Sequence, residues 1–145
     1  MITTRRVVIS VLLTLAVGVL IYSFTLVRPA NAPVVYKNSS VKTVSPSIGT
    51  LVLRESAVAI TLAPGYQLAT QGTDGLTIIA DGAVTGIPQD QIAITPAQNQ
   101  YVFLPTGGGV LSELPLGRVC AIAEIVQDTA PSATPQSFSW CFQTQ

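Results

Sequence analysis

The side chains that could carry chemistry in this chain are two cysteines, a few carboxylates and a few lysines. The 145 residues contain no histidine, which excludes Ser-His-Asp and Cys-His machinery and any histidine-based zinc or copper site. The single methionine, Met1, excludes thioether ligation of copper. A Ser–Lys dyad would need Lys37 or Lys42, and both fall in a predicted linker where no burial would activate a lysine. We therefore predict no catalytic residue, no cofactor and no enzyme.

The two cysteines, Cys120 and Cys141, are expected to form a disulfide, because an even count in an exported domain is typical of one. Two thiols without a histidine cannot complete a tetrahedral zinc site. Phe138, Trp140 and Phe142 share one face of the expected last strand, so Cys141 must point to the other face. If the Cys120 strand pairs antiparallel beside it, the disulfide joins two neighbouring strands on the outer surface.

Three aspartates form the one candidate set for a metal. Asp74, Asp81 and Asp90 fall in loops around one predicted hairpin, and Ca²⁺ accepts several oxygen ligands in flexible geometry. The alternative is that the first two are simply turn residues, because each precedes a glycine. No dense Asp-x-Asp spacing supports the metal, so the sequence predicts no metal site. Glu113 and Glu124 show no acid/base pairing and are expected to be solvated.

These residues follow an uninterrupted apolar run, Val7–Val27, that is preceded by Arg5 and Arg6. About 21 residues at 1.5 Å each span the roughly 30 Å hydrocarbon core of a bilayer. The positive flank keeps the N-terminus cytoplasmic and sends the C-terminal part out of the cytoplasm. The alternative is a signal peptide cleaved after Ala32, although a secretory apolar region is usually only about 7–15 residues long. We predict a single-pass membrane protein.

The chain divides into a cytoplasmic tail (1–6), a transmembrane signal-anchor helix (7–27), an extended stalk (28–45) and a β-domain (46–145). The part beyond the span carries four basic side chains, Lys37, Lys42, Arg54 and Arg118, apart from Arg28 at its border. Its seven acidic side chains are Glu55, Asp74, Asp81, Asp90, Glu113, Glu124 and Asp128. Nucleic acid is therefore not an expected partner, and no small-molecule substrate is indicated.

The exported part has the pattern of short strands joined by turns. Val58, Ile60 and Leu62 share a face at period two, and Asp81-Gly82 is a hairpin signal. The expected strands lie at residues 50–54, 57–62, 75–80, 91–95, 100–104, 118–126 and 137–143. Gly107–Gly109 opens a crossing for which a short helical turn is expected. This pattern predicts an all-β antiparallel sandwich of about seven strands.

The exported part resembles the bacterial Ig-like domains of S-layer and other surface proteins. The resemblance is carried by a Ser-Pro start at Ser45–Gly49, an alternating strand at Ala57–Leu62, a strand with a Gly hairpin at Leu76–Gly82, Phe103–Pro105 and the closing strand Phe138–Thr144. It implies an Ig-like sandwich, a cell-surface location and no catalytic residues. Such domains are commonly tandem modules without cysteines, whereas this chain has one copy and an expected disulfide.

The function expected from these features is a membrane-anchored, non-catalytic, extracytoplasmic Ig-like module with a structural, adhesive or protein-binding role. The membrane is contacted through Val7–Val27, and a protein partner is expected outside the cytoplasm. The span has no GxxxG face and no ionisable residue, which favours a plain anchor. The alternative is an accessory subunit of a cell-envelope membrane complex, or a secreted domain if the N-terminal segment is cleaved.

Overall fold

A computed structural model describes residues 37–70 and 74–145, and these form ten β-strands and two short 3-10 helices. The prediction of an all-β domain is confirmed. The expected span at 7–27, its flanks and the alternative cleavage site after Ala32 lie outside the described residues. Within the described part, no helix is long and apolar enough to cross a membrane.

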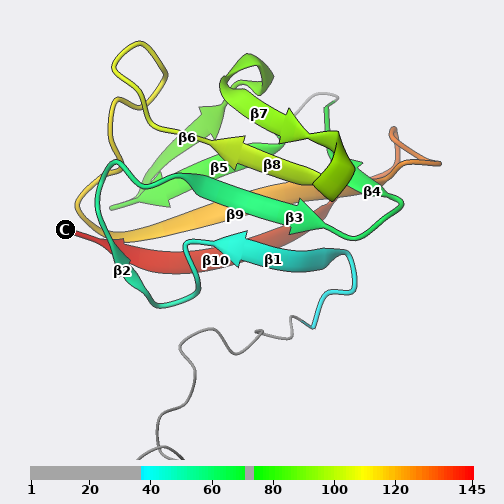
Figure 1. Ribbon diagram of the computed structural model, residues 1–145, viewed down its shortest axis with the longest axis horizontal. Helices are drawn as coiled ribbons and strands as arrows, with labels where there is room; N and C mark the ends of the chain where they lie inside the picture. The colour runs from blue at the N-terminus through cyan, green and yellow to red at the C-terminus, as the bar shows by residue number, and fades with distance from the viewer. Residues whose placement is uncertain (1–36, 71–73) are drawn as a thin grey trace, which may run out of the picture. The chain divides into compact units, whose positions relative to one another are not determined.

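The strands form two sheets that share one core (Figure 1). The four-stranded sheet has the order β1 (Val41–Ser45), β3 (Val58–Leu62), β8 (Gln100–Phe103), β7 (Ile92–Thr95). The larger sheet has the order β2 (Leu51–Val52), β10 (Gln136–Thr144), β9 (Gly117–Gln127), β5 (Leu76–Ala80), β6 (Ala83–Ile87). β4 (Tyr66–Leu68) pairs with the last residues of β9, beyond the part that pairs with β5. The 3-10 helices η1 (Gln89–Gln91) and η2 (Pro96–Gln98) flank β7.

The core is built on the antiparallel pair β9–β10, in which Trp140 and Phe142 face inward as predicted from the sequence. Trp140 and Phe142 are 2% and 1% exposed, and the partly buried Phe138 packs against the same cluster. Ala121 lies opposite Trp140 in the ladder and Ala123 lies opposite Phe138. Small residues on β9 therefore make room for the rings of β10, which is how a close-packed core accommodates large side chains.

The disulfide lies on the other face of this pair. Cys120 and Cys141 are direct cross-strand partners with a Cα–Cα distance of 4.0 Å and are joined by a disulfide. Both are partly exposed, whereas their neighbours Val119 and Trp140 are buried. The predicted position on the outer surface, joining neighbouring strands, is confirmed.

The predicted stalk at 28–45 is wrong at its C-terminal end, because Val41–Ser45 forms strand β1 and pairs with β3. Val41 and Val44 enter the core, three residues apart. The register shifts between Val41 and Thr43, as a β-bulge does. The bulge breaks the period-two alternation, so the sequence pattern does not reveal the strand.

The strand count and the purely antiparallel arrangement also need correction. Besides β1, the described residues contain β4 and β6, which the sequence prediction of about seven strands does not count. β2 pairs with β10 in parallel, with Leu51 opposite Gln143. β4 has three residues and carries too little periodicity to be recognised in the sequence. β2 was expected as a strand at 50–54, but its direction is set only by its partner β10.

Two of the three connections expected from the sequence are present in the structure, and one is absent. The β5–β6 turn holds Asp81 and Gly82 at φ 50° and 80°, as a two-residue hairpin turn requires. β7 and β8 pair antiparallel across Pro96–Asn99, as expected. The helical turn expected after Gly107–Gly109 is absent: residues 104–116 contain turns and bends only. The fully buried Leu114 anchors this crossing in the core, and the partly buried Leu111 packs against the same cluster.

Replacing both cysteines by alanine should lower the free energy of unfolding by about 3 kcal/mol, because the disulfide closes a loop with a sequence separation of 21. Urea unfolding can be followed by the fluorescence of Trp140, the single tryptophan. A reductant should destabilise the wild type by a similar amount and leave the double variant unchanged. Equal stability of wild type and variant would contradict this role.

Candidate functional site

The groups with catalytic potential are scattered or used structurally. Both cysteines are in the disulfide, and the described residues contain no free thiol. Lys37 and Lys42 are exposed at the start of the described chain. Within 37–70 and 74–145, no group of three or more Cys, Asp or Glu side chains could hold a metal ion.

The three aspartates proposed as a calcium set do not converge. Asp74 precedes β5 and Asp81 follows it, so a strand of about 17 Å separates them. Asp90 lies in η1, after β6. Ca²⁺ holds its oxygen ligands at about 2.3–2.6 Å, so this set cannot share one ion. The calcium hypothesis is wrong for these residues, and Asp81 is the turn residue that the alternative reading predicted.

Two glutamates make specific contacts in place of free solvation. Glu113 forms an ion pair of 2.9 Å with Arg54, whose Nε also donates to the Leu114 carbonyl at 2.7 Å. Glu124 accepts a hydrogen bond of 2.6 Å from the Ser137 hydroxyl. The first contact holds the 104–116 crossing against the chain after β2. The second joins β9 and β10, so neither carboxylate is positioned as an acid or base.

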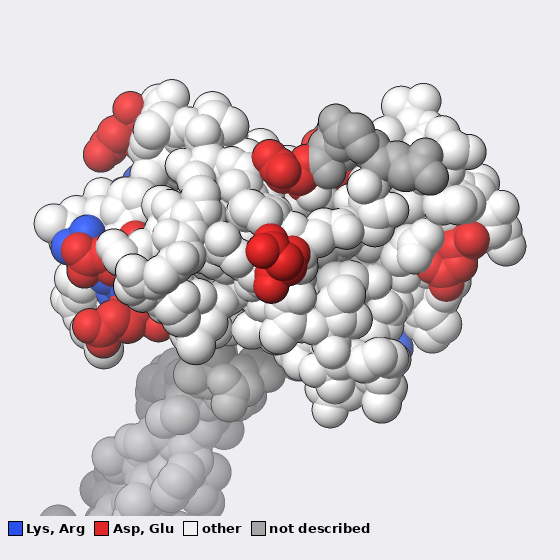
Figure 2. Space-filling view, turned by 90° about the horizontal axis from the view of Figure 1, so that it is seen from above, with Lys and Arg blue, Asp and Glu red and all other residues white. Residues whose placement is uncertain are grey.

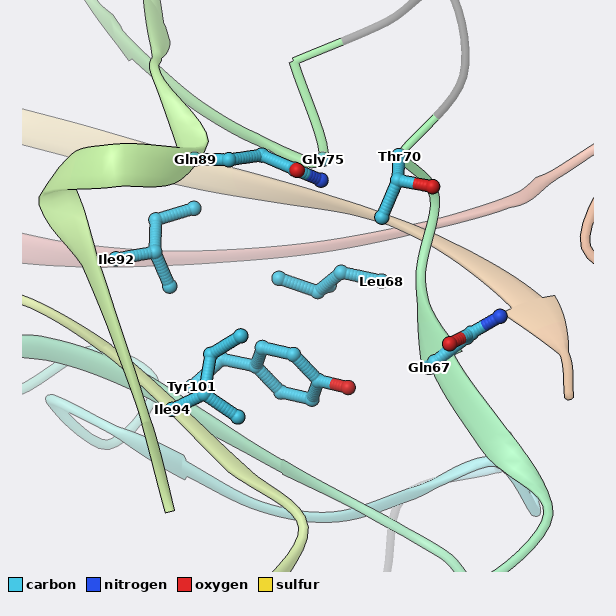
Figure 3. Close-up of a pocket in the computed structure, with 8 residues that line it drawn as sticks. All are labelled: Gln67, Leu68, Thr70, Gly75, Gln89, Ile92, Ile94 and Tyr101. Carbon is cyan, nitrogen blue, oxygen red and sulfur yellow. The ribbon is translucent and has the colours of Figure 1, made fainter. Parts of the chain in front are cut away.

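One feature suited to binding is a hollow of about 100 Å³ beside the edge strand β7, which we call the Tyr101 hollow (Figure 3). It is lined by Gln67, Leu68, Thr70, Gly75, Gln89, Ile92, Ile94 and Tyr101. Leu68, Ile92 and Tyr101 turn apolar atoms towards its centre, and the Gln67, Gln89 and Thr70 side chains lie around them. A small apolar space with a few polar groups is typical of a site that accepts one side chain or ligand group.

Tyr101 is the one titratable side chain that lines this hollow. Burial is the main cause that raises its pKa above the ordinary value of 10.0, and the negative charge of Asp128 adds to the effect. A backbone hydrogen bond at Leu68 acts in the opposite direction. The phenol is therefore held in its neutral form, in which it can donate and accept hydrogen bonds at physiological pH.

Sequence reasoning missed this hollow. Its walls come from β4, η1, β7 and β8, and β4 was not recognised as a strand. The available signal was Ile94, which shares one face of a short strand with the buried Ile92 and is nevertheless 58% exposed in the structure. In the sequence Ile94 is one more apolar residue at period two, so the pattern could not mark it as part of a site.

The chain matches no known protein-family model, and no curated protein matches its sequence. The function of the protein is therefore inferred from the geometry of the described domain and from the sequence itself.

The raised pKa of Tyr101 predicts a loss of stability at alkaline pH. Below about pH 10 the phenol is protonated in both states, and its contribution is fully present. As the pH rises further, the unfolded chain releases this proton first, so the free energy of unfolding falls. Unfolding of wild type and Tyr101→Phe should be compared from pH 7 to 11. The variant should show a shallower decline above pH 10, and parallel declines would contradict the assignment.

Proposed function

We propose that the described domain is an immunoglobulin-like module with a non-catalytic, protein-binding role outside the cytoplasm, and that residues 7–27 hold it to a membrane. The observation that carries the proposal is the strand order of the two sheets. In the immunoglobulin fold one sheet has the order A-B-E-D, and the other contains G-F-C with C′ added in variable-type domains.

The strand order supports this assignment in both sheets, apart from β4, which pairs with β9 outside that order. The smaller sheet corresponds to A-B-E-D when β1, β3, β8 and β7 take those places. The larger sheet corresponds to G-F-C-C′ when β10, β9, β5 and β6 take the places of these four strands. β2 is then a short continuation of the first strand that crosses to the other sheet and pairs with the last strand.

Two departures limit the assignment to the general fold. Antibody domains link their two sheets by a B–F disulfide that packs against a tryptophan on strand C. Here the disulfide joins neighbouring strands of one sheet, and Trp140 lies on the last strand. These departures argue against an antibody-type domain and leave the proposed kinship with bacterial surface domains intact.

A binding role is supported by what the domain exposes. Leu51, Leu53, Leu104 and Leu116 are each more than half exposed. All four lie where β2, β8 and β10 end and β9 begins, at one end of the two sheets. Exposed apolar side chains that gather in this way are typical of contact surfaces. The absence of histidine and the use of both cysteines in a disulfide argue against catalysis.

The proposed anchor can be tested by fractionating cells that express the full chain. The protein should stay in the membrane fraction after high-salt and alkaline washes and should need detergent for release, because a span of about 20 apolar residues is held by the bilayer. Its intact mass should include residues 1–32. A soluble protein whose mass begins at Pro33 would show that the segment is a cleaved signal. A version exported without 7–27 is the control and should be soluble.

Cross-linking in intact membranes followed by purification in mild detergent should recover the protein with another protein at its exported domain. The expected result is a partner protein that is cross-linked to the exported domain and stays with it through purification while the disulfide is intact. A stoichiometric multi-subunit membrane complex would favour the accessory-subunit alternative. Recovery of the protein alone, under conditions that preserve known envelope complexes, would contradict a protein-binding role.

A further inference from the structure

The edge strand β7 is open on one side. It ends the four-stranded sheet and pairs only with β8 among the described residues. Its residues Ala93, Ile94 and Thr95 are exposed, and the strand has no charge and no proline. Edge strands normally carry charged residues or proline, which prevent pairing with another chain. The opposite edge, β1, carries Lys42.

The Tyr101 hollow lies directly beside this edge, since Ile92 and Ile94 of β7 line it. At about 100 Å³ it is smaller than the roughly 150 Å³ cavity that holds a benzene ring in another protein. One aliphatic side chain therefore suits it better than a larger ligand. A strand added to β7 would direct alternate side chains to one face, which is how strand addition combines backbone pairing with a side-chain pocket.

Two aspartates lie near the hollow, and the basic side chain Lys42 lines the same surface pocket as one of them, Asp128. Asp90 lies in η1 beside Gln89, a wall residue, and the charge of Asp128 acts on Tyr101. Within the described residues, neither aspartate has a Lys or Arg nitrogen within 4.0 Å of its carboxylate, since the ion pair there joins Arg54 and Glu113. On the side of the domain seen in Figure 2, acidic groups are spread across the surface and basic groups appear only near its margins.

We propose that β7 and the Tyr101 hollow bind an extended segment of a partner protein in which one aliphatic residue is flanked, two positions away on each side, by Lys or Arg. The segment adds a strand to the four-stranded sheet. Its aliphatic side chain fills the hollow, and its cations lie towards Asp90 and Asp128. This inference rests on the proposed protein-binding function and names the chemistry of the partner.

The test uses the full chain in zwitterionic nanodiscs with methyl-labelled isoleucines, titrated with the peptide acetyl-Thr-Lys-Thr-Leu-Thr-Lys-Thr-amide. Binding should shift the methyl signals of Ile92 and Ile94 and leave that of Ile79, on the other sheet, unchanged. Peptides with Ser for Leu, or with Glu for both Lys, should not bind. No shift at millimolar peptide, or a shift centred on Ile79, would overturn the proposal.

Matched variants distinguish binding at this site from a general attraction between opposite charges. Asp90→Asn with Asp128→Asn should weaken binding about fivefold, as the loss of two exposed ion pairs predicts. Asp81→Asn with Glu55→Gln removes the same charge at other positions and should change binding less than twofold. Ile94→Lys should weaken it at least tenfold, because it places a cation at the exposed edge. Equal losses in the two double variants would overturn the assignment.

The partner experiment distinguishes failure of this site from failure of the function. If Ile94→Lys abolishes cross-linking of the full chain in membranes, as we expect, β7 is the contact surface. If the partner still cross-links equally well to Ile94→Lys, this site is refuted and the proposed binding function stands. Circular dichroism of the Ile94→Lys variant should show the wild-type sheet content, because the side chain is exposed.

Discussion

The antiparallel pair of β9 and β10 is the interaction on which the rest of the domain depends. Of the other strands in the larger sheet, β2, β4 and β5 each hydrogen-bond to one member of this pair. Its inner face sets Trp140 and Phe142 against the other sheet, and burial of such rings dominates the free energy of a small core. Because side chains alternate across a strand, burying these rings forces Cys141 outward, where it meets Cys120.

The polar side chains with specific contacts serve to hold connections in place. Arg54 ties the 104–116 crossing to the chain after β2 through Glu113 and the Leu114 carbonyl. Asn99, in a left-handed conformation, donates its side-chain amide to the carbonyls of Ala63 and Tyr66. These contacts join turns that are distant in sequence and satisfy carbonyls that no strand pairs.

The Tyr101 hollow arises because β4 and β5 pair with different parts of the same strand, β9. Both pair with β9, β4 at Ile125–Gln127 and β5 at Val119–Ala123. Thr70, which follows β4, and Gly75, which precedes β5, line the hollow together with residues of β7. The proposed strand addition follows from this topology, because the open edge and the apolar space lie side by side.

The sequence by itself determined the all-β class, the inward faces of β9 and β10, the outward disulfide and two hairpin turns, because each depends on period-two alternation or on local turn chemistry. It also excluded histidine-based chemistry by composition. Only the tertiary structure decided that Val41–Ser45 belongs to the domain, that β2 runs parallel to β10, and that Asp74, Asp81 and Asp90 stay apart. The Tyr101 hollow belongs to this second group. These features are set by contacts between segments far apart in the chain, and no local pattern specifies which distant strand a bulged or very short segment will meet.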